Sequence, residues 1–208
     1  MSRHWVIRLI PLEVFVVAAL LGWLITSGEW RVERGALDAS RSALYANLSP
    51  VFTPEVRHWE KDILKWSQTY GLDPNLVATV MQIESCGNPL AVSGSGARGL
   101  FQVMPYHFEV GEDMLDPETN ATRGLSYLAQ GLALAGGQAG LALAWYNGGH
   151  SQIGRDSSLW PGETQRYYYW GTGIYADALA GADRSQRLNE WLTAGGASLC
   201  ARAAEQLK

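Results

Sequence analysis

The residue best placed for acid–base chemistry is Glu84, which ends an apolar helical pattern and precedes a helix-breaking stretch. Val77, Val80 and Ile83 recur three residues apart before it, and residues 86–89 read Cys-Gly-Asn-Pro. A carboxyl group among apolar side chains loses hydration, and this disfavours its charged form and raises its pKa. A raised pKa allows a carboxyl to donate a proton near neutral pH. The alternative is a solvated glutamate at a helix end without a chemical role.

Neutral hydrogen-bonding groups follow Glu84 at short spacing. Ser93 opens a Gly/Ser-rich loop that extends to Gly99, and Gln102 lies within the apolar run from Leu100 to Met104. Glycines allow backbone groups of such a loop to approach a ligand closely. Hydroxyl and amide side chains suit sugar hydroxyls and N-acetyl groups. Among the nine Trp and nine Tyr residues, we expect most to pack in the core and a few to line a sugar cleft.

Composition and motifs argue against several functional classes. The net charge is −4 and the basic residues form no dense run, so no nucleic-acid partner is predicted. The four histidines are scattered and none forms an HExxH motif, so no metal is predicted. Residues 94–99 match the GxGxxG pattern of dinucleotide sites, but no strand precedes them and no βαβ unit surrounds them. No cofactor is therefore predicted.

Helix start and stop signals indicate a mainly α-helical domain around Glu84. Thr53 as N-cap and Pro54 predict a helix that ends at Gly71. Asp73 and Pro74 start the next helix, which carries Glu84 in its last turn. Strand signal is limited to at most a short hairpin near the Gly/Ser loop. The patterns predict further helices over residues 120–130, 138–146, 164–179 and 185–192.

An apolar segment near the N-terminus, Leu9 to Thr26, carries a single charge at Glu13. The whole segment just reaches the length of a transmembrane helix, whereas its charge-free part is typical of a signal peptide. We favour an uncleaved signal anchor, with secretion after cleavage as the alternative. Both predict an exported, extracytoplasmic protein of the cell envelope. The predicted organisation is an anchor (1–28), a linker (29–52), a catalytic domain (53–183) and a C-terminal helical extension (184–208).

The chain contains two cysteines, Cys86 beside the predicted active helix and Cys200 near the C-terminus. Exported domains fold in an oxidising compartment, where an even cysteine count indicates pairing. We predict a Cys86–Cys200 disulfide that ties the C-terminal helix to the catalytic domain. Two free, buried thiols are the alternative.

Motifs throughout the central part of the chain resemble those of the soluble-lytic-transglycosylase (SLT) type domain. Several motifs in the family's order are more specific than any one of them. The resemblance implies a lysozyme-like α+β fold that is mainly α. Two positions depart from the family's usual residues, Cys86 and Trp145. The segments that carry the resemblance are residues 84–89, 93–105, 116–128, 144–149 and 163–167.

The resemblance also implies a substrate and a set of site residues. The substrate would be the glycan strand of peptidoglycan, cleaved between N-acetylmuramic acid and N-acetylglucosamine. Glu84 would be the catalytic acid/base, Tyr167 would orient its carboxyl, and Glu163 would support the closing helix. The positions implied for substrate binding are Ser93, Gln102, Met104, Tyr146, Asn147, Glu163 and Tyr167.

The number of acidic residues in a convincing setting favours one mechanism. Ordinary glycosidases use two carboxylates, whereas only Glu84 has an apolar setting here. With one acid, the 6-hydroxyl of muramic acid would attack the anomeric carbon and leave a 1,6-anhydro end. A second carboxylate near Glu84, for which Glu163 is the candidate, would favour a hydrolytic muramidase instead. A third possibility is a non-catalytic, membrane-tethered wall-binding module, although such a module needs no protonatable group.

Overall fold

The computed structural model describes residues 47–208. The predicted signal anchor and the linker up to residue 46 lie outside this part of the chain. The described part is mainly helical, as the sequence predicts. None of its helices combines the length and apolar character needed to cross a membrane.

Helices of ordinary length are joined by short helical turns and one long loop. Two isolated antiparallel bridges, Val92–Arg98 and Arg98–Val103, are the only β pairing within residues 47–208, so the hairpin expected there is reduced to these bridges. The α-helices are α3 (Pro54–Arg57), α4 (Glu60–Tyr70), α5 (Pro74–Glu84), α6 (Pro117–Leu134), α7 (Ala139–Gly148), α8 (Gly162–Leu179), α9 (Gln186–Trp191) and α10 (Ala197–Gln206). The short turns are η1 (Pro105–His107), η2 (His150–Gln152), η3 (Ser157–Leu159) and the π-helical η4 (Leu192–Gly196).

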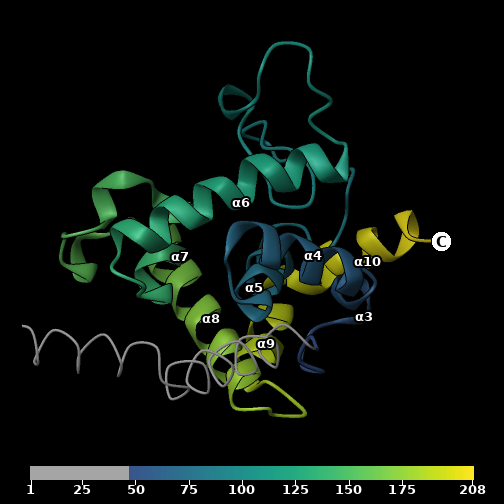
Figure 1. Cartoon of the computed structure of the whole chain (residues 1–208). Helices are drawn as coiled ribbons and strands as arrows, with labels where there is room; N and C mark the ends of the chain where they lie inside the picture. Colours follow the sequence, from purple (N-terminus) through teal and green to yellow (C-terminus); the bar gives the residue numbers. More distant parts are fainter. Residues whose placement is uncertain (1–46) are drawn as a thin grey trace, which may run out of the picture. The chain divides into compact units, whose positions relative to one another are not determined.

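The helix that carries Glu84, α5, lies between α4 and α8 (Figure 1). A helix that is apolar on nearly all sides is buried, and Val77, Val80 and Met81 of α5 are fully buried. Its start is capped as predicted, because an Asp73 carboxylate oxygen accepts a 2.8 Å hydrogen bond from the backbone N–H of Asn75. The neighbouring helices thus fix α5 along its length.

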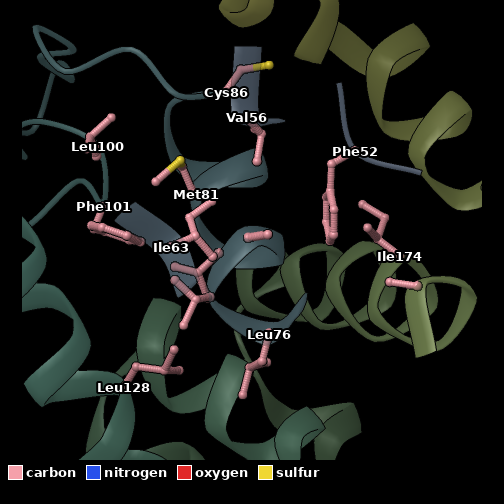
Figure 2. Packing of buried hydrophobic residues seen from close by; sticks show 14 of the residues in the cluster. Phe52, Val56, Ile63, Leu76, Met81, Cys86, Leu100, Phe101, Leu128 and Ile174 are labelled. Carbon is pink, nitrogen blue, oxygen red and sulfur yellow. The ribbon is translucent and has the colours of Figure 1, made fainter. Parts of the chain in front are cut away.

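The hydrophobic core gathers around α5. Figure 2 shows Ile63 of α4, Met81 of α5 and Phe101 of the long loop directed toward one another. Leu128 of α6 and Ile174 of α8 belong to the same core cluster, and all five side chains are fully buried. The loop that follows Glu84 is therefore anchored by its own apolar residues in the same core as the helices.

Segments at both ends of the described chain also join this core. Leu48, Val51 and Phe52 fall in the predicted linker, yet all three side chains are buried in the core cluster. Trp191 of the C-terminal extension belongs to the same cluster. Their apolar side chains cover surfaces that residues 53–183 alone would leave exposed to water.

The first predicted helix is two helices in the structure, α3 and α4. The break lies at Trp59, whose backbone leaves the helical region (φ −88°, ψ 11°). The Trp59 indole N–H donates a 2.9 Å hydrogen bond to the carbonyl of Gly87, and this tertiary contact outweighs the continuous apolar pattern. Thr53 does not cap α3 with its side chain, and instead its backbone N–H donates to Gln82 Oε1 over 3.1 Å.

Candidate active site

Glu84, the last residue of α5, borders two adjoining cavities. The first has a volume of about 380 Å³, and the second, of about 300 Å³, shares Glu84, Asn147 and Glu163 with it. The structure thus brings all of the sequence-predicted site residues around Glu84. Those that line the first cavity are Ser93, Gln102, Met104, Tyr146, Asn147 and Glu163, and Tyr167 lines the second.

The turn after Glu84 is held by specific contacts. The Ser85 hydroxyl donates a 2.7 Å hydrogen bond to the Leu100 carbonyl and accepts one of 3.1 Å from the Gly87 N–H. Gly87 has φ +82°, and a Cβ there would lie 2.7 Å from the backbone oxygen of Glu55. Only glycine fits this position. These contacts fix the end of α5, and therefore the backbone position from which the Glu84 side chain extends.

The same turn is bonded to the C-terminal helix. Cys86 forms a disulfide with Cys200 of α10, and their Cα atoms are 5.0 Å apart. The Gln82 side-chain amide donates a 3.1 Å hydrogen bond to the Cys86 sulfur. The pairing predicted from the cysteine count is therefore present, and it joins α10 to the turn two residues beyond Glu84.

The electrostatic setting favours a protonated Glu84. Burial raises the pKa of the Glu84 carboxyl from its ordinary value of 4.5 to about 8, because a charged carboxylate there would lose its hydration. The phenol of Tyr167 acts in the opposite direction and lowers this pKa, while the negative charge of Glu163 adds to the increase. Glu84 therefore holds a proton at neutral pH and can donate it.

Two tyrosines flank the Glu84 carboxyl. The Tyr146 hydroxyl donates a 2.7 Å hydrogen bond to the Phe101 carbonyl. The Tyr167 hydroxyl is buried near Glu84, and no group within residues 47–208 meets both the distance and the angle of a hydrogen bond with it. Burial raises the pKa of both phenols well above 10, so both remain neutral. Gly124 makes room for Tyr146, since a Cβ on Gly124 would lie 2.9 Å from the phenol oxygen.

The predicted polar residues of the loop hold its shape as well as lining the cavity. The Gln102 amide donates to the carbonyls of Ala91 and Gly99 over 3.2 and 3.1 Å. The Ser93 hydroxyl oxygen accepts a 3.0 Å hydrogen bond from the Ala97 N–H. Their polar atoms are thus positioned by the loop's own hydrogen bonds, which reduces the ordering that ligand binding would require.

Glu163 and Asn147 border both cavities. Glu163 is exposed in the first turn of α8, and its charge acts on the Glu84 carboxyl. Asn147 Oδ1 accepts a 2.8 Å hydrogen bond from the Thr164 hydroxyl, which joins the end of α7 to the start of α8. A second carboxylate therefore lies in the same cleft as Glu84.

Aromatic residues that sequence reasoning did not assign to the site line the first cavity. They are Tyr106, His107 and Tyr127. The ring centroids of Tyr106 and His107 are 4.5 Å apart, and those of His107 and Tyr127 are 4.9 Å apart. These rings offer faces for a sugar. Two of them directly follow Met104 and Pro105, so their closeness to the predicted binding segment was the available signal.

The second cavity contains residues that sequence reasoning also missed. Arg166 and Trp170 of α8 and Trp191 of α9 line it beside Tyr167. Arg166 precedes Tyr167 by one position, and Trp170 follows it by three. This closeness to a predicted site residue was the available signal for both. Trp191 reaches the cavity only through the packing of α9 on α8, and no local pattern reveals this contact.

Comparison with known proteins finds relatives that match part of the chain. The "Transglycosylase" of Enterobacteria phage PRD1 is 38% identical over 112 residues, covering 52% of this chain and 42% of the phage protein. The membrane-bound lytic murein transglycosylase C of Serratia proteamaculans is 38% identical over 82 residues, covering 32% of this chain and 22% of that protein. The chain therefore spans less than half the length of these curated relatives.

A solved structure, of an inactive mutant of the lytic transglycosylase Slt from Pseudomonas aeruginosa, aligns with a TM-score of 0.47 and 23% identity. The alignment covers 59% of this chain and 26% of that chain. The family model of the transglycosylase SLT domain matches residues 61–167, just over half of the 208 residues. The matched segment holds Glu84 and every other predicted site residue. This chain belongs to the transglycosylase SLT domain family.

Proposed function

We propose that this protein is a peptidoglycan lytic transglycosylase, which cleaves the β-1,4 bond between N-acetylmuramic acid and N-acetylglucosamine. The observation that carries the proposal is the position of the half-buried Glu84 carboxyl between two cavities lined mainly by polar and aromatic groups, where desolvation raises its pKa to about 8. Membership of the SLT family, and relatives named lytic murein transglycosylases, support the same activity. The lysozyme-like α+β architecture is part of this proposal.

Glu84 serves as acid and then as base in the proposed reaction. The carboxyl first gives its proton to the glycosidic oxygen as the bond to the anomeric carbon breaks. The carboxylate then takes the proton of the muramic acid 6-hydroxyl, whose oxygen forms the new bond to the anomeric carbon. Glu84 ends protonated and no water is consumed. A tethered hydroxyl has a very high effective concentration, which favours this intramolecular attack.

A specific observation favours a second candidate, a hydrolytic muramidase. Glu163 lines both cavities with Glu84 and could activate a water molecule as a second carboxylate. Glu163 is exposed, however, and lies outside the desolvated setting of Glu84. We therefore assign it a supporting role and give priority to the intramolecular reaction.

The product distinguishes these two reactions. Peptidoglycan digested by the transglycosylase should yield 1,6-anhydro-muramic ends, lighter by one water than hydrolytic ends and resistant to borohydride reduction. Mass spectra of the released fragments with and without borohydride measure this difference. Glu163→Gln should retain anhydro products. Predominantly reducing ends from the wild-type protein, lost in Glu163→Gln, would establish the muramidase instead.

We also propose that the protein acts in the cell envelope, held at the outer face of the membrane by the segment Leu9 to Thr26. The apolar segment and relatives named as membrane-bound transglycosylases support this location. Membranes washed with carbonate should retain the full chain, and a chain shortened to begin at Asn47 should remain in solution and active. A shortened, soluble form that arises from the full chain would indicate a cleaved signal.

A further inference from the structure

The second cavity beside Glu84 is built in part by residues outside the family-matched segment. Arg166, Tyr167 and Trp170 line it from α8, and Trp191 lines it from α9. The family model matches residues 61–167, so Trp170 and Trp191 lie outside the matched segment. Of the residues that line this cavity, only Glu84 exchanges a proton in the proposed reaction.

The position of Trp191 is fixed by its surroundings. Its side chain is 4% exposed and belongs to the core cluster. Gly196 lies directly against the indole, so that a Cβ on Gly196 would collide with the ring. The turn η4 brings this glycine over the indole, and the disulfide of Cys200 in α10 holds the following helix to the turn after Glu84. Trp191 is therefore a rigid wall.

Within the described chain, Arg166 is the one cationic residue that lines the second cavity. Arg166 is exposed and takes part in none of the ion pairs found within residues 47–208. Of the two carboxyl groups that line the cavity, Glu84 is protonated at neutral pH. Glu163 is negatively charged but exposed to water, and no ion pair joins it to Arg166. A guanidinium presents several N–H donors in the geometry of a carboxylate. Arg166 is thus available to an anionic ligand.

Cleavage at Glu84 requires the glycan strand to pass over this residue with sugars on both sides. The first cavity can hold the sugars on one side, and the second cavity lies across the shared residues Glu84 and Asn147. Muramic acid is the sugar of this strand that carries a carboxylate, either on its free lactyl group or on the attached peptide. Trp170 is half-buried and provides apolar surface for a sugar ring beside that charge, and the nearly buried Trp191 supports the wall of the cavity.

We propose that the second cavity binds the part of the strand across the cleaved bond, and that Arg166 pairs there with a carboxylate carried by muramic acid. This inference rests on the proposed function. It makes the C-terminal extension a part of the substrate site, since Trp191 supplies one wall. It also assigns to Arg166 a preference for carboxylated strands over neutral ones.

The test compares three preparations of the same glycan. The first carries its native peptides, the second has free lactyl carboxylates after the peptides are removed by an amidase, and the third has those carboxylates converted to methylamides. For the wild-type protein, kcat/KM should be about three- to tenfold higher on a carboxylated preparation than on the methylamide, a range set by an exposed charge-assisted hydrogen bond. Preference for the first or the second preparation identifies which carboxylate is bound.

Arg166→Gln should reduce this preference to near unity. Arg202→Gln is the matched control, because Arg202 is exposed on α10 and lines neither cavity, and it should keep the wild-type ratio. Trp191→Phe and Trp170→Leu should raise KM on all three preparations by more than they lower kcat. Trp191→Phe removes part of a nearly buried core side chain and should lower the melting temperature. Its kinetics are therefore measured at a temperature at which unfolding curves show the variant fully folded, so that a loss of folding is not mistaken for a loss of binding.

The outcomes separate the two proposals. A wild-type protein that cleaves all three preparations equally overturns the role of Arg166 and leaves the transglycosylase activity standing. The role of Arg166 is also overturned if Arg166→Gln keeps the wild-type preference for carboxylated over methylamide glycan. Failure to cleave any preparation would contradict the proposed function itself.

Discussion

The hydroxyl of Ser85 donates a 2.7 Å hydrogen bond to the carbonyl of Leu100, and this contact joins the end of the Glu84 helix to the loop that forms the first cavity. Both residues are fully buried. The bond spans 15 residues of sequence. One hydroxyl therefore couples the placement of Glu84 to the placement of the loop.

Ser85→Ala tests this coupling. Removing the hydroxyl leaves the buried Leu100 carbonyl unpaired, so the free energy of unfolding should fall by about 1–3 kcal/mol. Because the backbone at Glu84 is then held less firmly, its carboxyl is less well positioned, and kcat should fall by more than KM rises. Ser198→Ala is the control, because Ser198 is exposed on α10. This substitution should change the free energy of unfolding by no more than about 0.5 kcal/mol. Denaturant unfolding and steady-state kinetics measure both effects, and unchanged kcat in Ser85→Ala would refute the coupling.

Glu84→Gln should retain the fold and lose nearly all turnover. An amide neither donates nor accepts the proton, and general acid–base catalysis is typically worth about 10²–10⁴-fold, with more expected when one residue serves both steps. Glu118→Gln is the matched control, because Glu118 lies in an exposed ion pair with Lys65 and should keep full activity. Turnover of peptidoglycan by Glu84→Gln at the wild-type rate would remove Glu84 from the mechanism.

The activity of the wild-type protein should decline as the pH rises through about 8. The reaction begins with a protonated Glu84, and burial raises the pKa of this carboxyl to about 8. The alkaline limb of the kcat/KM profile reports the free-enzyme pKa of the essential acid. A profile of the wild type between pH 5 and 10 measures this value. An alkaline limb below pH 6 would contradict the desolvated setting of Glu84.

The same pKa makes stability depend on pH. The folded-state pKa of Glu84 is raised, so its contribution to stability is fully present below the ordinary value of 4.5 and is lost as pH rises to about 8. In that window the unfolded chain ionises at Glu84 while the folded chain holds the proton. Glu84→Gln removes this titration. Its melting temperature should therefore exceed that of the wild type by a margin that grows from pH 4.5 to 8, and a margin independent of pH would show that burial of the carboxyl has no energetic cost.

Tyr167→Phe should move the alkaline limb of the activity profile to higher pH. The phenol lowers the pKa of Glu84, so its removal leaves burial and the charge of Glu163 to raise that pKa further. The free energy of unfolding should change little, because no group in the described chain meets both the distance and the angle of a hydrogen bond with the Tyr167 hydroxyl. Tyr169→Phe is the control, since its hydroxyl bonds to Glu190 and lies away from Glu84. Superimposable pH profiles for Tyr167→Phe and the wild type would dismiss this interaction.

Parts of the fold with local capping and turn signals could be predicted from the sequence. Asp73 and Pro74 predict the start of α5, and the Cys-Gly-Asn-Pro stretch predicts its end at Glu84. The helix expected over residues 120–130 extends from Pro117 to Leu134 in the structure, and Asp116 before Pro117 caps its start. Its carboxylate accepts a 2.8 Å hydrogen bond from the Thr119 N–H, which is the same signal as at Asp73.

Features that arise from contacts between distant segments could not be predicted. Trp59 fits the apolar pattern of one long helix, and only its hydrogen bond to Gly87 explains the break. Trp191 has no motif around it, and it reaches the second cavity because α9 packs against α8. The motif residues were brought to the cleft as expected, whereas the residues that complete the second cavity depend on tertiary packing alone.

The disulfide has a consequence for the order in which the molecule is completed. Cys86 and Cys200 are separated by 114 residues, and a chain is synthesised from its N-terminus. The turn beside Glu84 therefore emerges long before the helix to which it becomes covalently joined. Until α10 follows, Cys86 remains an unpaired thiol open to oxidants and to other chains. Oxidative closure of this domain therefore requires that α10 has already been synthesised.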